Sequence, residues 1–129
     1  MKVVALDYGR ARTGIAVSDS TGTLARPLTV VRKAGTAAGM RTLLERIAEE
    51  QPELVVVGLP LTLRGERGEQ ARASERFADQ LRRRLEVPVV LFDERFTTTL
   101  AGRTTGSKHG DDALAAAHLL EGYLTRLAG

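Results

Sequence analysis

The sequence contains no cysteine and no tryptophan, and its two histidines are His109 and His118. The absence of cysteine excludes a disulfide framework, a thiolate zinc site and a cysteine nucleophile. Two histidines are too few for a metal site made of several imidazoles. Aromatic residues make up only 4% of the chain, so we expect a core of Val, Leu, Ile and Ala.

Long hydrophobic runs are also missing. The longest strongly apolar stretch, near residues 54–60, is far too short to cross a bilayer. The N-terminal segment reaches Asp7 and then Gly9 too early for a signal peptide. From these two absences and the lack of cysteine we expect a cytoplasmic protein that does not associate with a membrane.

The chain has 129 residues, of which 43% are hydrophobic and 27% are charged, and we expect residues 1–129 to form a single domain. Lys and Arg number 19 against 16 Asp and Glu, a formal net charge of +3. Of these 19 bases 16 are arginine, whose planar guanidinium grips phosphate oxygens. A phosphate-rich ligand explains this bias, and so does a genome rich in G and C.

The hydrophobic pattern predicts the order of the elements. Short apolar runs indicate strands at residues 3–6, 13–18 and 24–31, and the connections between them are too short for crossovers, so an antiparallel meander is expected. Pro27 suggests that the third strand is irregular or lies at an edge.

Further along the chain, helical spacing of apolar residues alternates with buried-type strands. The helices are expected at residues 40–48, 71–85 and 113–127, and the strands at 54–57 and 87–92. The order is therefore β-β-β-α-β-α-β-α. It predicts an α/β fold with a mixed five-stranded sheet, formed by a three-stranded antiparallel meander plus two parallel strands, with helices packed on it.

Acidic residues follow the ends of these strands. Asp7 ends the first strand, Asp93 and Glu94 end the last strand, and Asp111 and Asp112 open the last helix. Ligands of open α/β sheets gather beyond strand ends. Carboxylates that converge there bind cations, and oxygen ligands without His or Cys select Mg²⁺ or Mn²⁺. Two such ions form the clamp used for phosphodiester cleavage.

Each acid also has a purely structural interpretation. Asp7 is a common residue type in turns, and the acids at residues 93–94 can pair with Arg95 at the surface. One acid of the pair 111–112 can be the N-cap of the last helix. Three separate acidic clusters at the ends of elements favour a shared site over three unrelated structural roles.

Four motifs resemble those of the YqgF family of pre-16S rRNA nucleases, also called Holliday junction resolvase-like proteins. They appear in family order and span nearly the whole chain. The motifs are DYGRARTGIAVSD at residues 7–19, GLP at 58–60 with Gly65 and Gly68 behind it, DERFTT at 93–98 and DALAAAHLL at 112–120. The first and third are long enough to be specific.

The resemblance implies an RNase H-like fold and metal-dependent nuclease activity, with Mg²⁺ or Mn²⁺, toward structured nucleic acid. By motif position the catalytic and metal-binding acids fall on Asp7, Glu94 and Asp112, with Asp93 and Asp111 as alternative ligands. It further implies processing of the 5′ end of pre-16S rRNA in ribosome biogenesis, with the ribosome as a partner. A DNA endonuclease that resolves Holliday junctions and a non-catalytic RNA-binding module are the alternatives, and both a monomer and a homodimer remain open.

Basic residues near the motifs are candidate nucleic-acid contacts. They are Arg10, Arg12, Arg64, Arg95, Arg103 and Lys108. Arg10 and Arg12 either hold the scissile strand or neutralise the acidic cluster, and Arg95 either touches phosphate or forms an internal ion pair. Gly14 is expected to permit a close approach of the backbone. The segment 97–111 looks shorter than in the family, which bears on how the substrate is held.

Overall fold

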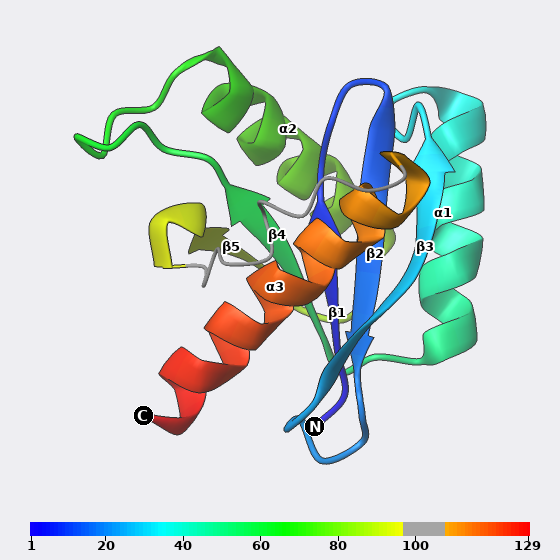
Figure 1. The fold of residues 1–129 in the computed structure, drawn as a ribbon. Helices are drawn as coiled ribbons and strands as arrows, with labels where there is room; N and C mark the ends of the chain where they lie inside the picture. The colour runs from blue at the N-terminus through cyan, green and yellow to red at the C-terminus, as the bar shows by residue number, and fades with distance from the viewer. Residues whose placement is uncertain (97–107) are drawn as a thin grey trace.

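A five-stranded mixed sheet lies at the centre of the fold (Figure 1). The computed structural model describes residues 1–96 and 108–129, and for residues 108–111 it describes the backbone only. The strands follow the order β3-β2-β1-β4-β5 across the sheet. They are Val3–Asp7 (β1), Arg12–Ser18 (β2), Ala25–Arg32 (β3), Leu54–Leu59 (β4) and Val89–Asp93 (β5).

The pairing of the strands confirms the predicted mixed sheet. β2 pairs antiparallel with both β1 and β3, whereas β4 pairs parallel with both β1 and β5. β3 lies at the edge, and the register of its pairing shifts between Ile15 and Ala16, where Pro27 faces Ala16. Since proline donates no ladder hydrogen bond, this edge position accommodates it.

Helices cover both faces of the sheet (Figure 1). The helices α1 (Ala37–Glu50) and α2 (Glu69–Arg84) pack on one face, and α3 (Lys108–Ala128) crosses the other. α1 begins after Thr36, whose hydroxyl accepts a hydrogen bond from the Gly39 amide at 3.1 Å. None of the helices in residues 1–96 and 108–129 is long and apolar enough to span a membrane.

The alternation of side chains along β1 divides the core into two halves. Val4 and Leu6 are buried beneath α1 and α2, whereas Val3 and Ala5 are buried beneath α3. Because successive residues of a strand point to opposite faces, Asp7 follows Val3 and Ala5 onto the α3 face. The side chain of Asp7 therefore lies on the face of the sheet that α3 covers.

The last helix begins earlier than the sequence indicated. α3 starts at Lys108, so Asp112 lies inside the helix. The expectation that Asp111 and Asp112 open the helix is wrong, and so is the alternative of an N-cap, because an N-cap residue stands outside the helical turns. The apolar periodicity that marked this helix begins only at Ala113, which is why its polar first turn was missed.

We expect Leu120→Ala to destabilise the protein by about 2–5 kcal/mol, because Leu120 is fully buried between α3 and the sheet. Leu127→Ala on the same helix is the matched control, since Leu127 is 53% exposed, and its effect is expected within about 0.5 kcal/mol. Urea denaturation measures both. Equal losses for the two variants contradict the packing described here.

Candidate active site

Three acids from separate elements approach one another at the carboxyl end of the sheet. Asp7 is the last residue of β1, and Glu94 is the first residue of the short 3-10 helix η1 (Glu94–Phe96), directly after β5. Asp112 comes from α3. The contact between α3 and the sheet and the strand order bring these three positions together.

Gly14 lets α3 approach the sheet beside Asp7. It pairs directly with Asp7 across β1 and β2, and a Cβ atom at Gly14 would overlap the Asp112 carbonyl oxygen. The backbone of α3 therefore lies on β2 where β2 has no side chain on that face. This is the close approach that the sequence predicted for Gly14.

Gly58 performs the same role on the other side of Asp7. β4 pairs with β1 as far as Val57, opposite Leu6, and Gly58 is the next residue. A Cβ atom at Gly58 would overlap the carboxylate of Glu94, so this carboxylate lies over the glycine. In the sequence, Gly58 was placed in the second motif, after the end of a strand, but no contact was assigned to it. A glycine inside an apolar strand was the available signal for a close approach.

Burial and mutual repulsion raise the pKa values of two of the acids. Burial, and then the charge of Asp112, raise the pKa of Asp7 to about 6. Burial, followed by the charges of Asp7 and Asp93, raises the pKa of Glu94 to about 7. The negative charge of Asp7 thus disfavours ionisation of Glu94, and that of Asp112 disfavours ionisation of Asp7. Bound cations relieve this kind of repulsion.

Asp93 belongs to a different local structure. It accepts hydrogen bonds from the Arg95 amide at 2.9 Å and from Nη2 of Arg95 at 2.6 Å, and these contacts lower its pKa. Arg95 also donates through Nη1 to the Leu63 carbonyl at 3.4 Å. Of the two neighbouring acids, Glu94 is therefore the one left to interact with Asp7.

Asp112 lies against Arg12. The Arg12 Nε atom is 3.0 Å from Asp112 Oδ2, yet its direction does not make a hydrogen bond, and Oδ2 is buried without a hydrogen-bond partner in the described part of the chain. Within residues 1–96 and the described side chains of α3, no three acids or histidines close around one point as metal ligands. Asp7 interacts with Asp112 and with Glu94 as two separate pairs.

The remaining candidate residues lie further out. Arg10 is exposed in the turn between β1 and β2, and Arg64 is exposed in the loop before α2. Arg103 lies outside the described residues, and the side chains of Lys108 and Asp111 also lie outside them.

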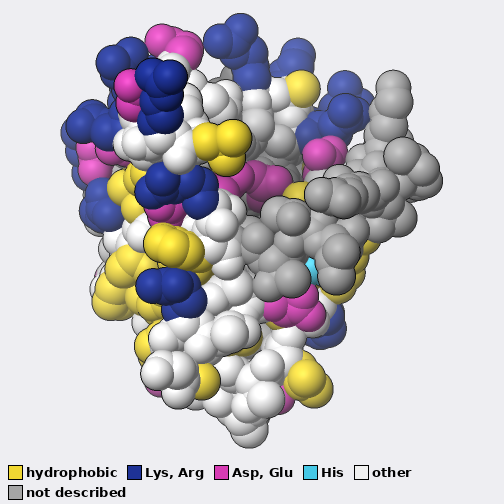
Figure 2. All heavy atoms as spheres, turned by 60° about the vertical axis from the view of Figure 1, so that its left-hand side comes forward, with side chains coloured by type: hydrophobic (Ala, Val, Ile, Leu, Met, Phe, Trp, Pro, Cys, Tyr) yellow, Lys and Arg dark blue, Asp and Glu magenta, His cyan; other side chains and the backbone are white. Residues whose placement is uncertain are grey.

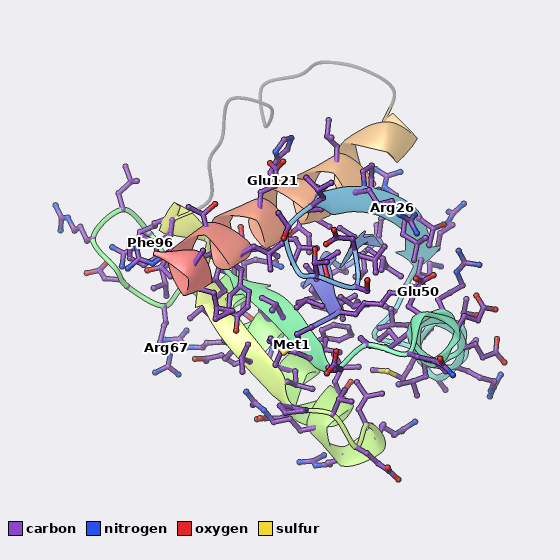
Figure 3. All side chains as sticks on the ribbon, turned by 90° about the horizontal axis from the view of Figure 1, so that it is seen from below. Met1, Arg26, Glu50, Arg67, Phe96 and Glu121 are labelled. Carbon is purple, nitrogen blue, oxygen red and sulfur yellow. The ribbon has the colours of Figure 1, made fainter. Side chains whose placement is uncertain are left out.

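Aromatic contacts fix η1 against the C-terminal half of α3. The Arg126 guanidinium carbon lies 3.9 Å from the centre of the Phe96 ring, and the Phe92 ring meets that of Tyr123 edge-on at 5.4 Å. Figure 3 shows Phe96 beside this end of the helix. The segment that carries Glu94 is thus attached to the helix that carries Asp112.

One face of the molecule carries many cationic side chains. Figure 2 shows Lys and Arg side chains mostly over the upper and left part of this view, with Asp and Glu side chains both among them and near the middle. Cationic side chains of this kind attract a phosphate backbone.

The fold is that of the RuvC-like resolvases, within the RNase H-like class. RuvC of T. thermophilus, solved in complex with a Holliday junction substrate, matches with a TM-score of 0.59 and 22% identity over 100% of this chain and 96% of that chain. The Fowlpox virus resolvase, solved with Holliday junction DNA, matches with a TM-score of 0.63 and 13% identity over 100% of both chains. At these identities the likeness shows the fold alone.

The chain belongs to the RuvX family, described as Holliday junction resolvase, whose model matches residues 1–126. The resemblance to the YqgF family is thereby confirmed. A relative from Rubrobacter xylanophilus, named "Putative pre-16S rRNA nuclease", is 46% identical over 95% of this chain and 91% of its own length. Relatives of the same name from Chloroflexus aurantiacus and Moorella thermoacetica are 40% and 38% identical, over 95% and 98% of this chain and 85% and 96% of their own lengths.

The raised pKa of Asp7 predicts a pH-dependent stability difference. The folded-state pKa, about 6, exceeds the ordinary 3.8, so the folded protein binds more protons in this window and loses stability as the pH rises through it. In chelator at pH 8, Asp7→Asn is expected to be more stable than wild type by roughly 1–3 kcal/mol, and the gap shrinks towards pH 4. Urea denaturation across pH measures it. Asp79→Asn, at an exposed acid, serves as control, and an Asp7→Asn protein less stable than wild type at pH 8 contradicts the interpretation.

Gly58→Ala is expected to displace the Glu94 carboxylate, because the new Cβ atom occupies its position. The pKa of Glu94 then falls from about 7 towards its ordinary 4.5, since distance from Asp7 and contact with water both favour the charged form. Carboxyl NMR titration measures this pKa. Gly68→Ala, where no atom lies within 4 Å of the added carbon, leaves it unchanged. An unshifted Glu94 in Gly58→Ala rules out the contact.

Proposed function

We propose that this chain is a divalent-metal-dependent nuclease that hydrolyses phosphodiester bonds in structured nucleic acid. The observation that carries the proposal is the placing of Asp7 between two further acids, Glu94 and Asp112, each supplied by a different element. Membership of a nuclease family agrees with it. We assign the catalytic role to these three acids.

The donor set fits a hard divalent cation. The three proposed ligands offer only carboxylate oxygens, which suit Mg²⁺ or Mn²⁺. Asp7 and Glu94 have raised pKa values, and Asp112 Oδ2 is buried without a hydrogen bond in the described part of the chain. Asp7 and Glu94 therefore gain from a positive partner, and Asp112, whose contact with Arg12 is not a hydrogen bond, can accept a cation in its place. When bound, such ions activate a water molecule and stabilise the leaving oxygen.

The residues of the chain supply position and charge. Asp7 is held by the pairing of β1 with β2 and β4, and Glu94 by the attachment of η1 to α3, so neither depends on a loop for its place. Arg10, Arg12 and Arg64 carry positive charge around the acids and are assigned to backbone phosphates. In this role they position the substrate without reading its sequence.

We assign the substrate as the 5′ end of pre-16S rRNA, with the ribosome as a partner and the cytoplasm as the place of action. The support is the shared name of relatives that match at least 95% of this chain. A four-way DNA junction is the second candidate, because the matching family is described as Holliday junction resolvase and the fold is that of enzymes solved with junctions. Symmetric cutting of a junction requires a dimer, so a monomer in gel filtration argues against the junction, whereas a dimer leaves the choice to the cleavage assay.

Asp7→Asn is expected to lower cleavage more than about 100-fold, because it removes one anionic ligand from the centre of the site. Binding of nucleic acid in chelator is expected to persist, since arginine contacts to phosphate are separate from the acids. The assay compares a precursor rRNA end with a four-way DNA junction, each with Mg²⁺, Mn²⁺ or chelator.

Asp79→Asn is the control for this assay, because Asp79 lies on the exposed side of α2 and pairs with Arg82 at 2.8 Å. Turnover like that of wild type by Asp7→Asn overturns the proposed function. Calorimetry that finds no Mn²⁺ binding by the wild-type protein favours a non-catalytic RNA-binding module instead.

A further inference from the structure

One carboxylate of the proposed active site already forms an ion pair with an arginine. Arg12 Nε lies 3.0 Å from Asp112 Oδ2, and the two side chains are 39% and 34% exposed. Both come from well-fixed backbone: Arg12 begins β2, and Asp112 lies over Gly14, two residues further along the same strand. The approach of α3 at Gly14 thus brings these two side chains together.

This ion pair satisfies Asp112 only in part. The oxygen that faces Arg12 is buried and accepts no hydrogen bond from any described residue, so the contact is a charge interaction without the directional bond that strengthens the best Arg–carboxylate pairs. Half-exposed pairs of this kind contribute little to stability. An anion that offers the guanidinium a directional bond competes with Asp112 at little cost.

Two neighbouring arginines, Arg95 and Arg10, have different contacts from those of Arg12. Arg95 donates from Nε and Nη2 to Asp93 and from Nη1 to the Leu63 carbonyl, so its guanidinium is held on both sides. Arg10 is exposed in the turn and has no ion pair among the described residues. Among these three, Arg12 combines contact with a proposed metal ligand and access to solvent.

We propose that Arg12 is a positioning residue that holds Asp112 in the free protein and exchanges this carboxylate for a backbone phosphate of the nucleic acid. The exchange leaves Asp112 available to the cation, and it gives each charged group a new partner. Nucleic acid and cation therefore strengthen each other's binding through Arg12, as thermodynamic linkage requires. The proposal rests on the proposed function, since it takes Asp112 as a metal ligand.

The first test is Mn²⁺ affinity in the absence of nucleic acid, measured by calorimetry. Arg12→Gln is expected to bind Mn²⁺ about fivefold more tightly than Arg10→Gln, or about 1 kcal/mol, because it alone removes the competing partner of Asp112. Arg10→Gln also removes one positive charge, two positions away. The comparison therefore cancels the general effect of lost positive charge on Mn²⁺ affinity. Arg12→Lys, which keeps the charge, is expected to lie between wild type and Arg12→Gln.

The second test is binding of a synthetic RNA hairpin in chelator, measured by fluorescence anisotropy. Asp112→Asn and Asp7→Asn each remove one negative charge, but only Asp112→Asn releases Arg12. Asp112→Asn is therefore expected to bind the RNA about threefold more tightly than Asp7→Asn. Placed on the Arg12→Gln background, the two substitutions are expected to have equal effects, which closes a double-mutant cycle.

The outcomes separate this proposal from the one it rests on. Loss of Mn²⁺ affinity in Asp7→Asn and Asp112→Asn, with equal affinities in Arg12→Gln and Arg10→Gln, overturns the exchange and keeps the nuclease site. Wild-type Mn²⁺ affinity in both acid variants overturns the proposed function itself. Thermal unfolding checks that each variant folds. If Arg12→Gln does not fold, the Mn²⁺ affinity of Arg12→Lys and the RNA affinities of Asp112→Asn and Asp7→Asn test the exchange.

Discussion

The repulsion between acids gathered at the carboxyl end of β1 is the constraint around which this site is arranged. Burial makes the ionisation of Asp7 and Glu94 costly, and the charges of Asp112 at Asp7 and of Asp7 at Glu94 add to this cost. Folding holds these groups together at the expense of stability, as functional sites commonly do. Under the proposed function, a divalent cation and a phosphate backbone supply the partners that make this arrangement favourable.

Two glycines make this crowding sterically feasible. On the α3 face, Asp7 stands between Gly14 of β2 and Gly58 of β4, which leave room for the helix backbone and for the Glu94 carboxylate. A rigid sheet, a short 3-10 turn and one helix thus set the positions of the acids. Two arginines pair with acids of this region: Arg95 with Asp93, and Arg12 with Asp112.

Local patterns were sufficient to predict the sheet and its strand directions, because alternation and short connections are written into neighbouring residues. They also placed acids at the ends of β1 and β5, but the choice of Asp7, Glu94 and Asp112 came from the resemblance to the family, and the catalytic role of these three acids stays a prediction. The start of α3 at Lys108 was missed because its first turn is polar. The pairing of Arg12 with Asp112 and the place of Glu94 over Gly58 depend on contacts between distant segments, so no local pattern reports them.

Anomalous diffraction from crystals grown with Mn²⁺ tests the central claim most directly, because it locates the ion without reference to any substrate. We expect a Mn²⁺ peak coordinated by Asp7 together with Glu94 or Asp112, with the Arg12 guanidinium withdrawn where Asp112 is a ligand. A Mn²⁺ peak bound elsewhere, with these three acids left uncoordinated at saturating Mn²⁺, would contradict it.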